Sequence, residues 1–389
     1  MGLVPAHLDP PQPAPAAGAL AAPRAGWPGW ARRLAGSVVA PSPAAMRRYA
    51  LAALLASVVI ILTGAAVRLS KSGLGCPDWP QCTAHSLVAG GDHGGSLVHR
   101  WIEFGNRLVT DAIFVISVLV FVVAWRYRPE GRRRRDLVWL AAAQPGAIVA
   151  QAIIGGIVVL TKLNPGWVSV HYLASAAQVA AAVALYVRCQ EGTGPARRLV
   201  RPEVRLISLA VIAAVALMLA AGTVVTGTGP LAGARSVPRY PLPLTGVTQL
   251  HADIGWLLGG LVIALVLALR LSSAPRRAVW LGWLLLALVA VQGSVGYGQY
   301  FSGLPAGVVW VHEVGAASIW VIALLLPYAL RERPAGFTDG SQARPAARNP
   351  AGIGSIGGEA PRPATVPSAT VLSSAPEPSA SDRDAAEGA

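Results

Sequence analysis

Residues 151–171 read QAIIGGIVVLTKLNPGWVSVH, and residues 292–312 repeat the pattern as QGSVGYGQYFSGLPAGVVWVH. Both stretches begin with Gln, carry Gly four positions later and Leu twelve positions later, and end in Val-His. Each reads as the end of one apolar helix, a short break containing Pro and Gly, and the start of a second helix that carries a histidine. The matching register predicts an internal duplication, with chance similarity between Gly- and Val-rich segments as the alternative.

The composition is that of a membrane protein. Of the 389 residues, 54% are hydrophobic and 13% are charged, and a helix needs about twenty apolar residues to cross the hydrocarbon. We therefore expect an all-α integral membrane protein whose eight transmembrane helices form two pseudo-repeated four-helix bundles. The expected spans are 49–67, 96–125, 137–161, 167–187, 206–226, 251–269, 278–299 and 306–330.

The formal net charge of +14 is concentrated in alternate connections between these spans. In an eight-helix arrangement such connections lie on one side, and the positive-inside rule makes that side cytoplasmic, with both termini inside. Because the charge follows topology, it argues against a nucleic-acid partner. The arginine clusters are 126–135, 188–205, 270–277, 331–333 and the pair at 47 and 48.

Composition also divides the chain into four parts. Residues 1–45 and 334–389 are rich in Ala, Pro, Gly or Ser and lack apolar runs, so we expect two disordered cytoplasmic tails. Between them, residues 46–190 would form an N-terminal four-helix half and residues 204–330 a C-terminal half.

Four histidines open the even-numbered helices of this arrangement, near the outer side of the membrane: His99, His171, His251 and His312. A lone histidine at such a position usually serves as a hydrogen-bonding residue. Imidazole is nevertheless a standard axial ligand of haem iron, and facing helices of a bundle can present two imidazoles to one porphyrin. The repeat pairs His99 with His171 and His251 with His312, which predicts one haem site in each half.

Two further groups lie close to the first histidine. His99, Glu103 and Arg107 are spaced by four residues and share one helical face. Glu103 either forms a structural ion pair, with Arg107 or Arg100, or belongs to a substrate site. Cys76 and Cys82 lie in the preceding external loop, either as a disulfide or as two free thiols.

Five motifs resemble those of the heme A synthase family. The resemblance covers roughly residues 46–330 and is closest to an actinobacterial type. It implies an oxidoreductase of the bacterial cell membrane that oxidises the C8 methyl group of haem O to the formyl group of haem A, for cytochrome c oxidase. The motifs are CPDWPQC (76–82), HRWIEFGNRL (99–108), GGIVVLTKLNPGWVSVHYLASA (155–176), TGTGP (226–230) and VHEVGAA (311–317).

The resemblance also implies ligands and partners. His251 and His312 would ligate a haem b in the C-terminal half, and His99 and His171 would hold the substrate or product haem in the N-terminal half. The loop with Cys76 and Cys82 would match the family's external disulfide loop. Implied partners are haem O, the lipid bilayer, the haem O-producing enzyme and a membrane electron acceptor, and the sequence leaves a homo-oligomer open.

Two departures from the family pattern matter. Many members carry a catalytic Glu three residues before the first histidine, where this chain has Ser96. We therefore expect the catalytic carboxylate to be Glu103, with Asp92 as second choice. The family's TGTGP is also often followed by His, where this chain has Leu231, but that histidine is not one of the four ligands.

Two other functions use the same features. A di-haem electron-transfer protein of the cytochrome b type would employ the four histidines without altering its haems. A haem transporter would also be built from repeats, but it predicts helices broken at the middle of the membrane. The Gly/Pro breaks of this chain fall at the helix ends instead.

Overall fold

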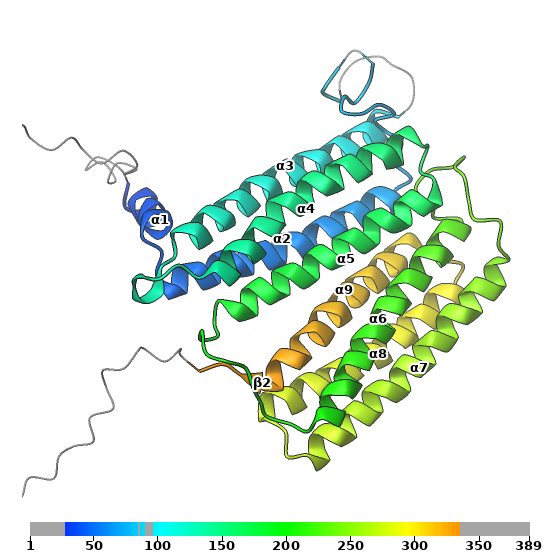
Figure 1. Cartoon of the computed structure of the whole chain (residues 1–389). Coiled ribbons are helices and arrows are strands. Elements are labelled where there is room, and N and C mark those ends of the chain that lie inside the picture. The colour runs from blue at the N-terminus through cyan, green and yellow to red at the C-terminus, as the bar shows by residue number, and fades with distance from the viewer. Residues whose placement is uncertain (1–27, 85, 90–95, 335–389) are drawn as a thin grey trace, which may run out of the picture. The chain divides into compact units, whose positions relative to one another are not determined.

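The computed structural model describes residues 28–84, 86–89 and 96–334. Within them, eight helices are long and apolar enough to cross a membrane, as the sequence predicts. Figure 1 shows these spans together with a short helix before them and a two-stranded pair. The spans are α2 (Pro43–Leu69), α3 (Leu97–Arg126), α4 (Arg135–Leu160), α5 (Pro165–Arg188), α6 (Pro202–Thr228), α7 (Leu244–Leu271), α8 (Arg276–Phe301) and α9 (Ala306–Ala329). The remaining elements are α1 (Gly29–Val39), the 3-10 turn η1 (Pro129–Gly131), β1 (Arg197–Arg198) and β2 (Arg331–Glu332), which pairs antiparallel with β1.

Two of the histidine helices, α5 and α7, begin earlier than predicted, whereas α9 begins at Ala306 as predicted. α7 begins at Leu244, so His251 is its eighth residue rather than its first. His171 and His312 are each the seventh residue of their helices, whereas His99 is the third residue of α3. Hydropathy marks only the apolar part of a helix, so the predicted spans leave out polar first turns. The start of α5, for example, comes from Pro165 at its first position and from Asn164, whose side chain accepts a hydrogen bond from Gly166 N at 3.0 Å.

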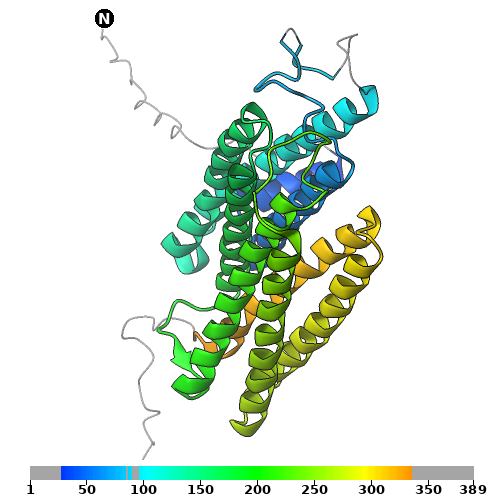
Figure 2. The ribbon, with the colours of Figure 1, turned by 90° about the vertical axis from the view of Figure 1, so that its right-hand side faces the viewer.

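The eight spans form two four-helix rings that lie side by side (Figures 1 and 2). In the first ring α2, α3, α4 and α5 pack in cyclic order, which places α3 and α5 diagonally; in the second ring α6 to α9 do the same, with α7 and α9 diagonal. The rings meet through α2 and α5 on one side and α6 and α9 on the other. There Trp320 Nε1 donates to the carbonyl of Ala176 at 2.8 Å. All four histidines therefore lie on diagonal helices.

The two rings also agree in helix length. α2 and α6 have 27 residues each, α4 and α8 have 26, and α5 and α9 have 24. Only α3, with 30 residues, and α7, with 28, differ. These lengths are consistent with the duplication, which stays an inference from the sequence.

In α7, α8 and α9 of the second ring, burial is confined to the parts nearer the arginine-rich end. The buried residues of α7 lie within 258–269, those of α8 within 278–285 and those of α9 within 317–329. Among the described residues of the opposite end, 244–257, 286–301 and 306–316, none is buried. His251 and His312 lie in this less buried part and are themselves half-buried.

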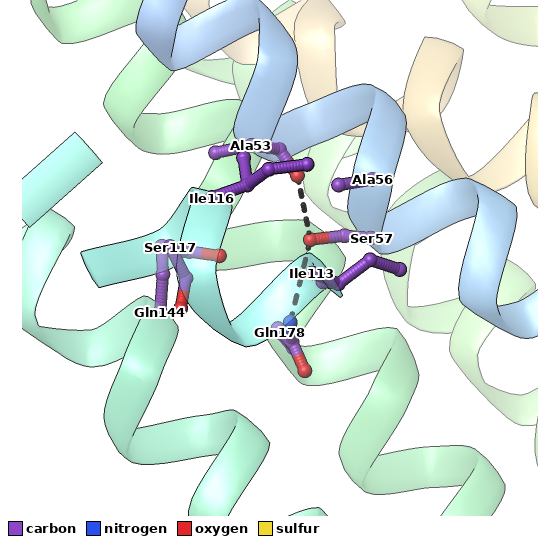
Figure 3. Close-up of a pocket in the computed structure, with 8 residues that line it drawn as sticks. All are labelled: Ala53, Ala56, Ser57, Ile113, Ile116, Ser117, Gln144 and Gln178. Carbon is purple, nitrogen blue, oxygen red and sulfur yellow. Dashed lines mark hydrogen bonds between the residues drawn. The ribbon is translucent and has the colours of Figure 1, made fainter. Parts of the chain in front are cut away.

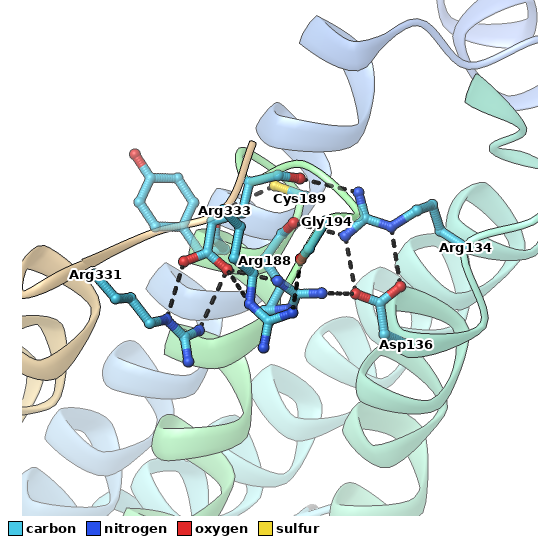
Figure 4. Close-up of polar contacts among 9 residues, drawn as sticks. Arg134, Asp136, Arg188, Cys189, Gly194, Arg331 and Arg333 are labelled. Atoms are coloured by element: carbon cyan, nitrogen blue, oxygen red, sulfur yellow. Dashed lines mark hydrogen bonds and ion pairs between the residues drawn. The ribbon is translucent and has the colours of Figure 1, made fainter. Parts of the chain in front are cut away.

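Ion pairs join the helix ends at the arginine-rich end (Figure 4). Asp136 at the start of α4 pairs with Arg134 at 2.8 Å and with Arg188 at 2.6 Å. Glu191, just after α5, pairs with Arg188 at 2.6 Å and with Arg331 at 3.2 Å. This cluster links α4, α5 and the segment after α9, which holds the two rings together at that end.

The tails differ from expectation in their described part. Residues 29–39, which composition assigned to a disordered tail, form α1. Val38 of this helix packs against the buried cluster that contains Met46, and the hydroxyls of Ser37 and Tyr49 lie 3.1 Å apart. A short apolar face gains its stability from such tertiary contacts, which composition does not reveal. Residues 1–27 and 335–389 lie outside the described residues.

Candidate functional site

Three of the four histidines pack against a glycine of the preceding helix. In each case the ring atom Cε1 lies close to the position that a Cβ atom would take on that glycine. A Cβ atom would touch the imidazole at all three positions and would be tight at Gly296, so the glycine leaves the space in which the imidazole lies. The pairs are His171 with Gly155 at 3.4 Å, His251 with Gly222 at 3.4 Å and His312 with Gly296 at 3.2 Å.

Two glutamines hold the backbone of the same histidines. Gln151 Nε2 donates to the carbonyl of His171 at 3.2 Å, and Gln292 Nε2 donates to the carbonyl of His312 at 2.8 Å. The repeated Gln, Gly and His of the sequence thus have one shared geometry. Gln binds the helix that carries the histidine, and Gly, four residues later, contacts the imidazole.

These three imidazoles fit the role of haem ligands. Among the described residues, none hydrogen-bonds to the buried Nδ1 of His171, His251 or His312. None of their Nε2 atoms has a hydrogen bond to a described residue either. Packing alone therefore orients the three imidazole groups. A ring fixed in this way, with Nε2 available, is what axial ligation of iron requires.

His251 and His312 form the best pair. They lie on the diagonal helices α7 and α9, and each packs against a glycine of the preceding helix. The surrounding ends of α7, α8 and α9 lack buried side chains among their described residues.

His99 has different surroundings. Its Nδ1 lies 2.8 Å from the hydroxyl of Ser72, a fully buried residue of the loop after α2. The same loop packs on the His99 backbone, because a Cβ at Gly75 would overlap the His99 carbonyl. The structure thus gives His171, His251 and His312 matching environments and places His99 beneath the loop.

Glu103 fastens that loop to α3. Its carboxylate accepts hydrogen bonds from Cys76 N at 2.7 Å and from Arg107 at 2.8 Å. Arg107 also donates to the carbonyls of Cys76 and Asp78, each at 3.2 Å. The ion pair left open by the sequence is therefore the one with Arg107, and Cys76 and Cys82 form a disulfide. Asp92, the second candidate carboxylate, lies outside the described residues.

One polar link between the rings was missed by sequence reasoning. Arg68 of α2 pairs with Glu313 of α9 at 2.6 Å, and Glu313 also hydrogen-bonds to Tyr172 of α5. Tyr172 follows His171, and Glu313 follows His312, so the link joins the neighbours of two histidines. The sequence did offer one indication of this link. Arg68 and Glu313 are charged residues inside apolar spans, where placing a charge costs free energy unless it is paired.

The middle of the first ring carries a polar layer with one residue from each helix (Figure 3). Gln178 Nε2 lies 3.4 Å from Ser57 Oγ, and the buried Gln144 Oε1 has no hydrogen-bond partner among the described residues. At the same distances from the helix ends, the second ring carries only apolar residues. The layer is Ser57, Ser117, Gln144 and Gln178, and the counterparts are Ala216, Val262, Leu285 and Ile319.

Fold and site define a multi-pass membrane protein whose two helical rings carry imidazoles on diagonal helices. The chain belongs to the cytochrome oxidase assembly protein family COX15-CtaA, whose family model matches residues 47–325. It is similar to the heme A synthase of Shewanella oneidensis, with 26% identity in an alignment 322 residues long that covers 71% of this chain and 94% of that protein.

Shorter matches point to the same family. The heme A synthase of Lysinibacillus sphaericus is 31% identical over 121 residues, which are 31% of this chain and 36% of that protein. That of Geobacillus kaustophilus is 31% identical over 111 residues, 28% of this chain and 31% of that protein. The family expected from the sequence motifs is thereby confirmed, and neither the electron-transfer protein nor the transporter is favoured.

Proposed function

We propose that this chain is a heme A synthase, an oxidoreductase that converts the C8 methyl group of haem O to the formyl group of haem A for cytochrome c oxidase. The observation that carries the proposal is the family match over residues 47–325. The imidazoles held against glycines on diagonal helices support it, because they suit haem and no ordinary soluble substrate. Haem supplies the redox chemistry that side chains lack.

In this proposal one four-helix ring binds the cofactor haem and the other binds the substrate haem. His251 and His312 hold a haem b in the second ring, residues 204–330. His171 holds the substrate haem in the first ring, residues 46–190. The sequence repeat assigns His99 to the same site, but the glycine contact that supports the other three imidazoles does not extend to His99. All four residues were predicted as iron ligands, and the packing of His171, His251 and His312 supports three of these assignments.

Glu103 is the proposed carboxylate of the first site. Because both of its oxygens are engaged by Cys76 N and Arg107, it acts first as a positioning residue for the disulfide loop. Proton acceptance during methyl oxidation would require one of these partners to release it.

Orientation and partners complete the proposal. The arginine-rich end faces the cytoplasm together with both termini, in a bacterial cell membrane, and the disulfide loop faces the oxidising side. The expected partners are the haem O-producing enzyme and a membrane electron acceptor, and a homo-oligomer is compatible with the exposed apolar faces of the spans.

The direct test is to co-express the chain with a source of haem O and to analyse extracted haem by mass. Haem A, or its hydroxymethyl intermediate, should form with the wild-type chain and not with His171→Ala, which serves as the matched control. Unchanged haem O beside a bound haem b would instead favour the di-haem electron-transfer protein.

A further inference from the structure

Four glycines lie at comparable places in the helices that precede the histidine helices, but only three of them face an imidazole. Gly155, Gly222 and Gly296 each meet the Cε1 of a histidine at 3.2–3.4 Å. At Gly64 of α2, no described atom outside its own helical surroundings lies within 4 Å of the Cβ position. Gly64 and Gly222 lie five and six residues before the ends of α2 and α6, and fraying of a helix end by one residue accounts for the difference.

Distances to the helix ends identify the residue that belongs opposite Gly64. His171 and His312 both lie 17 residues before the ends of α5 and α9. His251 lies 20 residues before Leu271, the end of α7, and the residue 20 positions before the end of α3 is Asn106. His99 lies 27 positions before that end.

His99 and Asn106 are therefore on the same face of α3 but at different depths. Seven residues are close to two full turns, which separates the two by about 10 Å along the helix axis. This shared face makes His99 look equivalent to His251 in the sequence. The open space at Gly64 fits a short side chain, such as that of Asn106, at this level of α3.

Asn106 also has a side-chain oxygen that is able to accept a hydrogen bond. Its Oδ1 is buried and has no hydrogen-bond partner among the described residues. A carboxamide is not among the usual axial ligands of haem iron, which are imidazole, thiolate, thioether and phenolate groups. Such a side chain can hydrogen-bond to a small molecule beside the iron without ligating the metal.

We propose that Asn106 occupies the fourth imidazole position, so that the first ring holds its haem by His171 alone. The iron face toward Asn106 and Gly64 is then open to a small ligand, whereas the second ring closes both faces with His251 and His312. This inference rests on the proposed function only in taking the first ring as a haem site, and it replaces His99 as the ligand opposite His171.

Spin state and carbon monoxide binding test the proposal without measuring activity. The purified, haem-loaded full-length chain should contain one low-spin haem and one haem that binds carbon monoxide after reduction. Asn106→His should remove the carbon monoxide binding and add a second low-spin signal. The reciprocal His251→Asn should make the second ring bind carbon monoxide as well.

His99→Ala is the decisive control, because it should leave both signals unchanged. Two low-spin haems in the wild-type chain, or conversion of a low-spin haem to high spin in His99→Ala, would overturn the proposal. These readouts remain informative if Asn106→His fails to fold.

Failure of the proposed function looks different. A chain that binds carbon monoxide at one haem but leaves haem O unchanged keeps this inference and loses the enzymatic assignment. A chain that makes haem A but contains two bis-imidazole haems keeps the enzymatic assignment and loses this inference. Absence of haem from the first ring in every variant would overturn both.

Discussion

His312 and Gly296 show at the scale of single residues how a small side chain positions a functional one. A Cβ at Gly296 would lie 3.2 Å from Cε1 of the imidazole, closer than such contacts usually are. Gly296→Ala should therefore shift the ring and weaken haem retention in the second ring, measured by haem content and the low-spin absorption bands.

Gly298→Ala, at an exposed position of the same helix, is the matched control for this prediction. No described atom lies near its Cβ position, and Ala is favoured over Gly in a helix by about 1 kcal/mol. We expect unchanged haem content and an equal or higher thermal midpoint. Equal loss of haem from both variants would contradict the role of the glycine contact.

Glu103 gives a second prediction at this scale. Glu103→Ala should retain haem but lose haem O conversion, because the Cys76 amide and Arg107 lose their acceptor and the loop loses its anchor. Breaking a buried pair by removing one partner costs about 3–5 kcal/mol. Glu103→Gln can still accept from Cys76 N, so conversion by this variant would assign a positioning role, and full activity of Glu103→Ala would shift attention to Asp92.

The cysteines carry a prediction at the scale of elements. The loop cysteines Cys76 and Cys82 are disulfide-bonded, and burial raises the pKa of the Cys189 thiol to about 11. Because the thiolate is the reactive form, we expect no alkylation of the folded, non-reduced chain at pH 8. After reduction, an impermeant reagent added to intact cells should label the two loop cysteines only. Labelling of Cys189 from outside would contradict the proposed orientation.

The polar layer of the first ring is a further feature of this scale. Gln144 Oε1 is buried without a partner among the described residues, and an unsatisfied buried polar group costs about 1–3 kcal/mol. Gln144→Leu, which installs the residue found at Leu285 in the second ring, should therefore raise the thermal midpoint. A lower midpoint with loss of haem from the first ring would instead assign the layer a role at the substrate site.

For the whole molecule, the sequence predicted the number of spans and the histidines of three matching sites. Hydropathy suffices for the spans because every backbone polar group in a membrane is paired within its own helix. Our proposal that Asn106, rather than His99, corresponds to His251 depends on depth, because sequence spacing reports the face of a helix but not its depth. The depth of α3 depends on the loop that Glu103 and Arg107 hold.

The register of α3 also changes how this chain departs from its family. With Asn106 at the level of His251, the residue three positions earlier is Glu103 rather than Ser96. The carboxylate expected there is then present, and the histidine is the residue replaced. The link from Arg68 to Glu313 was beyond sequence reasoning, because its partners are 245 residues apart and meet only when the rings pack.

Haem identity at each site is the measurement that tests the account most directly. The chain and its variants His312→Ala and His171→Ala would be purified with a haem O source, and the haem per chain would be counted and weighed. We predict two haems in the wild-type chain, one of them oxidised at the former methyl group. His312→Ala should lack haem b, and His171→Ala should keep haem b but form no haem A. The same unaltered haems in all three proteins would contradict a division into a cofactor ring and a substrate ring.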